Sequence, residues 1–319
     1  MSRILKLKNI SLQQVDLADF SYSLSPEQDD LPDETLISSI SRYGILHPPI
    51  VRETSPESYT VVAGRKRLLA LASLERENTC ACLIISSRIP EADVFFILLE
   101  EVQLARPLTA VEKAIFLQKT MAIMDERLII EEFLPRLGLA PHASVLKQAL
   151  KLLSLEDPIL CSIQHGRTNA AVAHELIGLS AQDRMALFAL IEALRLSFSY
   201  QKKLLNICRD LASRGNTSIA ALLDHDEVHE ILQHQEANPP QKTKNLMLWL
   251  TRSQMPRYKE ATEEFKRFTT AMHLPQNVSV DHTPYFEDDA MTLSITFPDR
   301  KSLQQAWEKI RHAAHSSDN

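Results

Sequence analysis

Apolar and polar positions follow two different periods in the first part of the chain. The segment LISSISRYGIL, residues 36–46, has apolar residues at helical spacing and predicts a helix that ends at its glycine. The segments PPIVRE (48–53), YTVVAG (59–64) and CACLII (80–85) are short and rich in β-branched or small apolar residues, so they predict strands. We expect a small α/β domain over residues 1–110.

Helical spacing dominates the next part of the chain. Apolar residues recur every three or four positions in five segments, 110–124, 143–155, 169–179, 184–196 and 200–212. This pattern predicts an all-helical domain over residues 111–235. The polar segment EANPPQKTKN, residues 236–245, contains a proline pair and is typical of a linker.

The last part of the chain, residues 246–319, predicts a small ββα domain. MTLSITF, residues 291–297, alternates apolar and polar positions and predicts a strand that buries Leu293, Ile295 and Phe297 on one face. NVSVDHTPYF is its expected partner strand, with the acidic residues 287–289 as the turn. A covering helix follows, marked by Leu303, Ala306, Trp307 and Ile310. So small a sheet favours pairing of this domain with a second copy of the chain. The alternative is a monomer in which the domain packs on the rest of its own chain.

Composition places the chain among soluble, helix-rich proteins. It has 319 residues, 45% hydrophobic and 24% charged, with only six glycines and a formal charge of −6. That charge argues against indiscriminate coating of nucleic acid and leaves room for a local basic site. The four cysteines form no CxxC pair, so we expect buried thiols rather than zinc. No apolar run is long enough to span a membrane, and we expect a cytoplasmic protein without a membrane partner.

Three consecutive cations follow a glycine in VVAGRKRLLALA, residues 61–72. Gly64 ends a predicted strand, and Arg65, Lys66 and Arg67 then open a helix. Positive charge is unfavourable at a helix N-terminus, where a bound phosphate would offset it. The alternative is that the three side chains extend into solvent or pair with nearby carboxylates.

The order and spacing of several residues across about 80 positions carry a family resemblance. They are Ser39 and Ile40 before Gly44, Pro48, Gly64 with Ala70 six residues later, and Glu101 ahead of LTAVEKA. In these features the chain resembles the N-terminal domain of the ParB family of chromosome and plasmid partition proteins. The resemblance implies a ParB/sulfiredoxin-like fold that binds CTP with magnesium. It also implies a clamp of two subunits that closes on DNA and is reset by hydrolysis.

The resemblance assigns a set of candidate nucleotide-binding residues. These are Gly44, Gly64, Arg65, Lys66, Arg67, Glu101 and Arg106, with Glu101 also the candidate metal ligand. The chain departs from the family pattern at two of the motifs. Arg65 stands where the family has a glutamate implicated in hydrolysis, and Val102 stands where it has a metal-binding asparagine; the family's arginine position is Ala105, with Arg106 displaced by one. We therefore expect at most a weak CTPase.

Residues 129–179 resemble the helix-turn-helix region of the same family. Gly138 is expected in the turn and residues 142–153 as the recognition helix, with Leu146, Leu150 and Leu153 toward the core. The candidate DNA-binding residues are His142, Ser144, Lys147, Gln148, Lys151 and Arg167. The alternative is an ordinary bundle helix with solvated lysines.

These features predict a nucleoid-associated, homodimeric ParB-like protein that binds a centromere-like double-stranded DNA site. The resemblance also implies a Walker-type partner ATPase of the ParA kind, which an arginine-rich N-terminal segment of the family stimulates. This chain has only Arg3, Lys6 and Lys8 in that segment. A transcriptional regulator of ParB architecture without a nucleotide cycle is the main alternative. A small-molecule kinase of this fold would rely on Glu100 and Glu101 and is disfavoured by the helix-turn-helix. Sulfiredoxin is disfavoured because the glycine motif has no cysteine.

Overall fold

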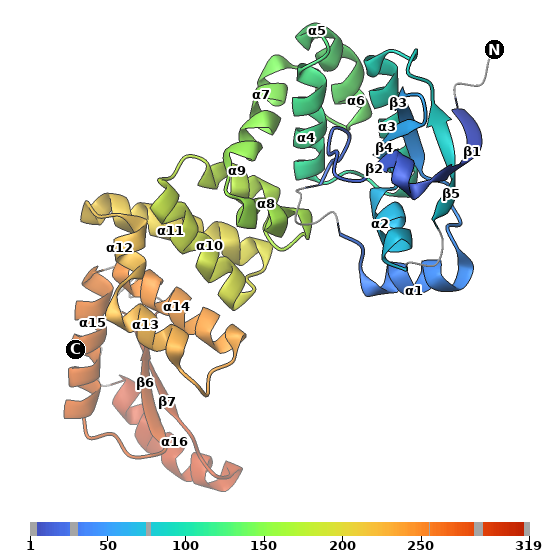
Figure 1. Cartoon of the computed structure of the whole chain (residues 1–319). Coiled ribbons are helices and arrows are strands. Elements are labelled where there is room, and N and C mark those ends of the chain that lie inside the picture. Colours follow the sequence, from blue (N-terminus) through green and yellow to red (C-terminus); the bar gives the residue numbers. More distant parts are fainter. Residues whose placement is uncertain (1–4, 26–30, 75–77, 255, 284–289, 316–319) are drawn as a thin grey trace. The chain divides into compact units, whose positions relative to one another are not determined.

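The computed structural model describes residues 5–25, 31–74, 78–254, 256–283 and 290–315 (Figure 1). The chain divides into two compact units. The first comprises residues 1–206 and 218–223, and the second comprises residues 207–217 and 224–319. The three-part division drawn from the sequence, with boundaries at 110, 235 and 245, stays a prediction. The predicted fold class, an α/β N-terminal part, a helical middle and small C-terminal strands, is confirmed.

A five-stranded mixed sheet forms the N-terminal part of the first unit. Its order is β1-β5-β3-β4-β2. The pairs β1/β5 and β3/β4 are antiparallel, and the pairs β3/β5 and β2/β4 are parallel. The strands are β1 Leu5–Ser11, β2 Val15–Asp16, β3 Ile50–Ser55, β4 Ser58–Ala63 and β5 Thr79–Ile85. The three strands expected from the pattern are confirmed, and β1 and β2 are additional. Leucine and lysine alternate at the start of β1, which is itself a strand pattern, and the lysines are typical of an edge strand.

Three helices accompany this sheet, α1 Glu34–Tyr43, α2 Arg65–Ser73 and α3 Glu91–Ala105. The side chain of Asp33 caps α1 by accepting a hydrogen bond from the backbone N–H of Leu36. Gly44 ends this helix with a φ of 70°, as the sequence predicts. Helix α2 begins directly after β4, so the sheet carries the three cations to a fixed place at the carboxyl end of that strand.

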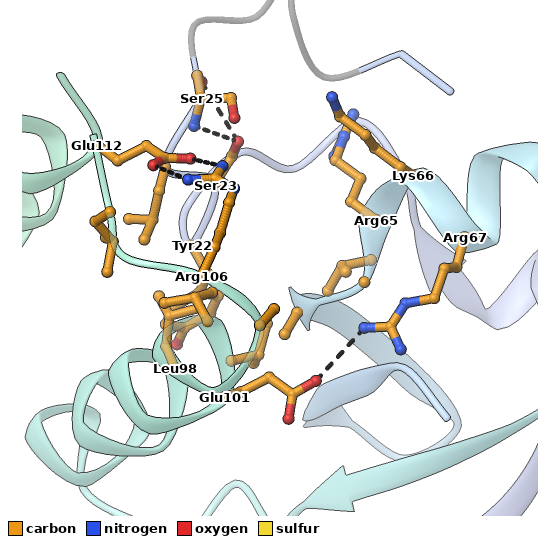
Figure 2. A pocket seen from close by; sticks show the side chains of 18 of the residues that line it. Tyr22, Ser23, Ser25, Arg65, Lys66, Arg67, Leu98, Glu101, Arg106 and Glu112 are labelled. Atoms are coloured by element: carbon orange, nitrogen blue, oxygen red, sulfur yellow. Dashed lines mark hydrogen bonds and ion pairs between the residues drawn. The ribbon is translucent and has the colours of Figure 1, made fainter. Parts of the chain in front are cut away.

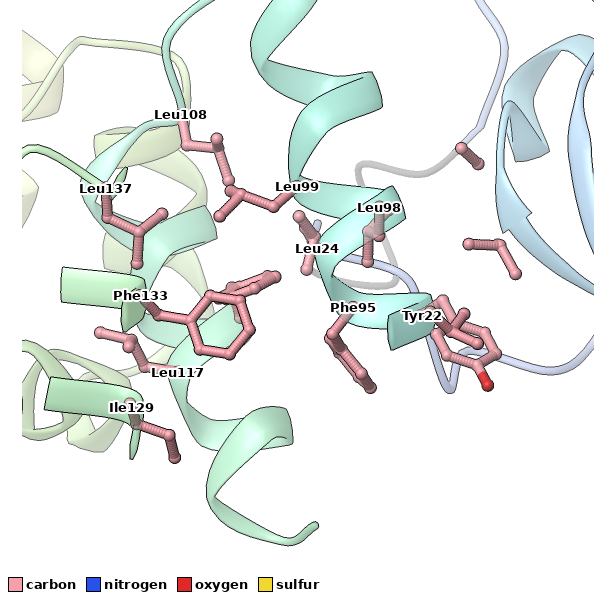
Figure 3. Close-up of a cluster of buried hydrophobic side chains, with 14 of the residues drawn as sticks. Tyr22, Leu24, Phe95, Leu98, Leu99, Leu108, Leu117, Ile129, Phe133 and Leu137 are labelled. Atoms are coloured by element: carbon pink, nitrogen blue, oxygen red, sulfur yellow. The ribbon is translucent and has the colours of Figure 1, made fainter. Parts of the chain in front are cut away.

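Helix α3 joins the sheet to the helical region through a shared hydrophobic core (Figure 3). Phe95 lies against Tyr22 on one side and Phe116 on the other, with ring centroids 5.4 and 5.7 Å apart. Phe96 stacks on Phe133 at 4.4 Å, and Phe116 meets Phe133 edge-on at 5.1 Å. The apolar core is therefore continuous across the predicted boundary at residue 110, and that burial couples the two regions mechanically.

The helical region confirms the five segments expected from their periodicity. Its elements are α4 Ala110–Met121, α5 Glu126–Leu128, a π-helical stretch Ile129–Phe133, α6 Leu134–Arg136, α7 Ala143–Lys151, α8 Asp157–Gln164, α9 Ala170–Leu176, α10 Ala181–Leu194, α11 Phe198–Gly215 and α12 Ile219–Leu223. Short 3-10 turns occur at Leu12–Gln14 and Leu152–Ser154. None of the helices among the described residues is long and apolar enough to cross a membrane.

The turn before α7 has the geometry that the glycine predicts. Gly138 has a φ of 70°; its N–H donates to the carbonyl of Pro135, and the N–H of Leu139 donates to the carbonyl of Leu134. This pair of bonds is a Schellman motif, which ends the preceding helix and reverses the chain. Residues 126–151 thus form two helices separated by a short turn.

The second unit contains α13 Asp226–Gln233, α14 Pro239–Gln254, α15 Pro256–Ala271, β6 Val278–His282, β7 Met291–Ile295 and α16 Arg300–His315. The predicted strands and final helix are present, and the strands pair antiparallel. The expected acidic turn at 287–289 lies outside the described residues. The predicted linker is wrong in its second half, because residues 239–245 begin α14. Asn238 caps that helix by accepting from the N–H of Gln241, and proline is well tolerated in the first helical turn.

The prediction that one face of the C-terminal sheet is buried is also wrong within a single chain. Leu293 is 57% exposed and Trp307 53% exposed, while Ile295 and Phe297 are half-buried. Leu303 of α16 is exposed as well. A two-stranded sheet has too little area to bury an apolar face by itself.

Candidate functional site

A pocket of about 380 Å³ lies where β4 ends and α2 begins (Figure 2). The pocket is lined by residues 19 and 22–25, by residues 61–67, by α3, and by the segment that leads into α4. Its cationic lining residues are Arg65, Lys66, Arg67 and Arg106, and its acidic ones are Asp19, Glu101 and Glu112. The three consecutive cations therefore surround a cavity, as an anion-binding site requires, and two of them are also engaged by protein groups.

Gly64 allows Arg67 to fold back across the first turn of α2. Gly64 has a φ of 89°, and a Cβ placed on it would lie 2.7 Å from a guanidinium nitrogen of Arg67. That guanidinium donates to the carbonyl of His47 at 2.5 Å and lies 3.6 Å from a carboxylate oxygen of Glu101. The backbone conformation thus favours glycine at this position, and a Cβ there would displace the guanidinium of Arg67.

Arg65 points its guanidinium at the segment that forms the opposite wall of the pocket. The guanidinium carbon lies 3.9 Å from the ring centroid of Phe20, and one nitrogen donates to the carbonyl of Asp19 at 2.9 Å. The carboxylate of Asp19 accepts from the hydroxyl of Thr60 on β4 at 3.0 Å. Lys66, between the two arginines, is exposed.

The same wall is attached to the sheet through Tyr22. Its hydroxyl donates to Glu91 at 2.5 Å and accepts from Arg52 at 2.7 Å, and Arg52 also pairs with Glu91. Burial, together with the hydrogen bond to Glu91, raises the pKa of Tyr22 to about 12. Lys119 of α4 donates to the carbonyls of residues 20 and 21. The wall therefore connects the sheet, the start of α2 and the first long helix of the helical region.

Arg106 and Glu112 form a two-point ion pair at the other end of the pocket. The guanidinium donates to both carboxylate oxygens, at 2.8 and 2.5 Å, and Glu112 is only 5% exposed. One of these oxygens also accepts from the backbone N–H of Thr109, which caps α4. Burial by itself would raise the pKa of Glu112, but the hydrogen bonds and charge of Arg106 outweigh it and hold the pKa below its usual range.

Six of the seven residues assigned to nucleotide binding line this pocket, and Gly44 does not. Gly44 ends α1, and nothing lies within 4 Å of a Cβ placed on it. Sequence reasoning missed Asp19, Tyr22 and Glu112. Asp19 and Tyr22 lie in an irregular segment without periodicity, and Glu112 was visible only as the last residue of a capping box that begins at Thr109.

The residues assigned to DNA binding on α7 share one exposed side of that helix. His142, Ser144, Lys147, Gln148 and Lys151 are all exposed, whereas Leu146 on the opposite side is buried. Leu150 and Leu153, also expected toward the core, are half-buried. Residues 143–151 contain no carboxylate, so nothing on the helix itself neutralises the two lysines. This face is suited to contact phosphates.

Arg167 lies apart from α7, in the loop between α8 and α9. It is exposed and pairs with Glu192 at 3.2 Å. The loop backbone is held by the buried Gln201, whose amide donates to the carbonyl of Arg167 at 2.6 Å and accepts from the N–H of Asn169 at 2.9 Å. Arg167 therefore has a fixed backbone, with its charge partly offset by a glutamate.

Comparison with known families gives one match, to the ParB N-terminal domain, over residues 4–95. These residues include the whole five-stranded sheet and α2. The resemblance seen in the sequence is thereby confirmed for this part of the chain.

Similar curated proteins are named nucleoid occlusion protein. The one from Lysinibacillus sphaericus is 29% identical over 154 residues, which are 48% of this chain and 49% of that protein. Those from Listeria monocytogenes and Bacillus cereus are 27% and 29% identical over 151 and 155 residues. The chain spans about half the length of the curated relatives it matches.

Two solved structures are also similar, both of C-terminally truncated chromosome-partitioning protein ParB from Caulobacter crescentus. The complex with CTP-gamma-S is 20% identical, with a TM-score of 0.24, and covers 58% of this chain and 98% of that one. The complex with the centromeric parS site is 23% identical, with a TM-score of 0.26, and the match covers 62% of this chain and 96% of that one.

Proposed function

Because residues 4–95 belong to the ParB N-terminal domain family, we propose that this chain is a ParB-like DNA-binding protein of chromosome or plasmid partition. The observation that carries the proposal is the succession of that domain and a helix, turn and helix over residues 126–151, joined by one core. The polar side of α7 would enter the major groove of a centromere-like site. The name shared by the relatives supports a role on the nucleoid.

The pocket is the proposed site for CTP. Its volume, its cations and the N-terminus of α2 suit a nucleotide with its phosphates toward residues 64–67. We expect little or no hydrolysis, because Arg65 replaces the carboxylate that the family resemblance implies and is engaged with Phe20 and Asp19. Rapid phosphate release from CTP in the presence of a specific DNA site would contradict this expectation.

A second copy of the chain is the proposed partner of the C-terminal unit. The exposed Leu293 and Trp307 support pairing, since large apolar side chains seldom remain uncovered. A partner ATPase of the ParA kind is proposed from the family resemblance alone. A transcriptional regulator without a nucleotide cycle is the second candidate, favoured by the replacement of the metal-binding asparagine by Val102.

Direct selection of DNA fragments by the full chain, followed by affinity measurements at several salt concentrations, tests the DNA-binding proposal. Replacing Lys147 and Lys151 by glutamine should weaken binding and reduce the salt slope by about 2, one unit for each phosphate contact. The matched control replaces two exposed lysines elsewhere, Lys6 and Lys301, and should leave the slope unchanged. An unchanged slope in the first variant would exclude α7 as the DNA-contacting helix.

A further inference from the structure

The pocket offers few oxygen atoms that could hold a divalent metal ion. Two of its three carboxylates, those of Asp19 and Glu112, accept hydrogen bonds with both oxygens. Both oxygens of Glu112 accept hydrogen bonds from Arg106, and one of them also accepts from Thr109. The oxygens of Asp19 accept from the N–H of Ser21 at 2.7 Å and from the hydroxyl of Thr60 at 3.0 Å. These two carboxylates stabilise the walls of the pocket.

Glu101 is the remaining carboxylate, and a guanidinium lies beside it. Its oxygen is 3.6 Å from a nitrogen of Arg67 (Figure 2). Arg67 is held in place by its hydrogen bond to the carbonyl of His47. A dication bound to Glu101 would lie next to this positive charge. Val102, the following residue in the pocket, offers no oxygen ligand, so Glu101 would have to hold magnesium, together with phosphate and water oxygens, without help from its neighbour.

The hydroxyl groups of Tyr22 and Ser23 do not replace the missing metal ligands. The hydroxyl of Tyr22 is donated to Glu91, and the hydroxyl of Ser23 interacts with the backbone of Ser25. Among the described residues, no group of three or more His, Cys, Asp and Glu side chains is arranged to hold a metal. The family resemblance implies a magnesium ion held by a glutamate and an asparagine. Here Arg67 lies beside the glutamate and Val102 replaces the asparagine, so these side chains do not fit the ion.

Cationic residues nevertheless outnumber acidic ones in the lining of the cavity, by four to three. Arg65, Lys66, Arg67 and Arg106 all line it, and the first turn of α2 adds its backbone N–H groups. Lys66 and Arg106 also line an adjoining hollow of about 440 Å³ whose lining residues include no carboxylate. One guanidinium group can bind two oxygens of a phosphate at once. It thereby supplies the positive charge that a metal ion supplies in other nucleotide sites.

We infer that this pocket binds its nucleotide without a divalent metal ion, with arginine and lysine side chains neutralising the phosphates. The inference rests on the proposed function, because it takes the nucleotide to be bound in this pocket. Glu101 then has a role opposite to that of a metal ligand: it restrains Arg67 and opposes the incoming negative charge.

Calorimetric titration of CTP into the full chain, once in EDTA and once in magnesium, tests the inference. We expect the two dissociation constants to agree within about threefold, a difference too small for a coordinated metal. Binding that requires magnesium, or that magnesium tightens tenfold or more, would overturn the inference while leaving the proposed nucleotide site intact. Absence of binding in both solutions would overturn the nucleotide site itself, and the inference with it.

The variant Glu101→Gln distinguishes the two roles by the sign of its effect. Without a metal, removal of this carboxylate releases Arg67 and should tighten CTP binding in EDTA on the order of tenfold, as expected for one like charge removed near the phosphates. If Glu101 were a metal ligand, the same variant would weaken binding in magnesium, and that result contradicts the inference. Glu100→Gln is the matched control, because Glu100 pairs with Arg136 and does not line the pocket. It should bind CTP as the unmodified chain does, and thermal melting checks that both variants are folded.

Discussion

The guanidinium of Arg65 lies over the ring of Phe20, 3.9 Å from its centroid. This contact joins the start of α2 to the segment that forms the opposite wall of the pocket. A cation at a helix N-terminus is unfavourable by itself, and the aromatic face offsets part of that cost. Arg65 therefore lines the cavity and also stabilises its wall.

Replacement of Phe20 by leucine should test this contact. Leucine keeps the apolar bulk and removes the aromatic face, so the free energy of unfolding should fall by about 1 kcal/mol. Chemical denaturation measures the change. Phe198→Leu, at an exposed phenylalanine of α11, serves as control and should change the free energy of unfolding by less than half as much. Equal effects of the two substitutions would show that the cation–π contact contributes nothing.

Replacement of Gly64 by alanine should lower both stability and ligand affinity. The φ of 89° is strained for alanine and costs about 1–2 kcal/mol, and the new methyl group would displace the guanidinium of Arg67. Gly138→Ala is a close control, because Gly138 also has a positive φ but nothing within 4 Å of its Cβ position. Thermal melting and CTP titration should show a loss of stability in both variants and a loss of affinity in Gly64→Ala alone. Unchanged CTP affinity in Gly64→Ala would show that Arg67 does not contribute to CTP binding.

The ion pair of Arg106 and Glu112 predicts a loss of stability in acid. The pKa of Glu112 is lower in the folded chain than in the unfolded chain, so the unfolded state takes up the proton first as the pH falls. The stabilisation is complete above the ordinary pKa of about 4.5 and decreases as the pH drops through the folded-state pKa. The difference in melting temperature between the unmodified chain and Glu112→Gln should therefore shrink below about pH 4.5. A difference that stays constant down to pH 3 would contradict this assignment.

The exposed apolar residues of the C-terminal unit predict association of two chains. Replacing Trp307 and Leu293 by serine should shift the chain toward monomer by at least tenfold in the dissociation constant, since each residue would bury a large apolar area in a dimer. Sedimentation equilibrium measures the shift. Leu7→Ser, at an exposed leucine of β1, is the control and should leave the mass unchanged. A monomeric unmodified chain would exclude the proposed homodimer.

The sequence by itself determined the type and order of most elements, because these depend on local patterns. Helical spacing identified α1, α4, α7, α9, α10 and α11, and short runs of β-branched or small apolar residues identified β3, β4 and β5. The glycines identified two chain reversals, at Gly44 and Gly138. The cations of residues 65–67 line a cavity, and Arg67 also pairs with Glu101, so their binding of a phosphate stays a prediction.

Only the tertiary structure decided where each side chain points and what shares its surroundings. It brought Asp19, Tyr22 and Glu112 into the pocket, left Gly44 outside it, and placed Arg67 next to Glu101. It also showed that Leu293, apolar in a regular strand, stays uncovered within one chain. These contacts join residues far apart in the sequence, and the free energy of such long-range packing leaves no periodic signal in the chain itself.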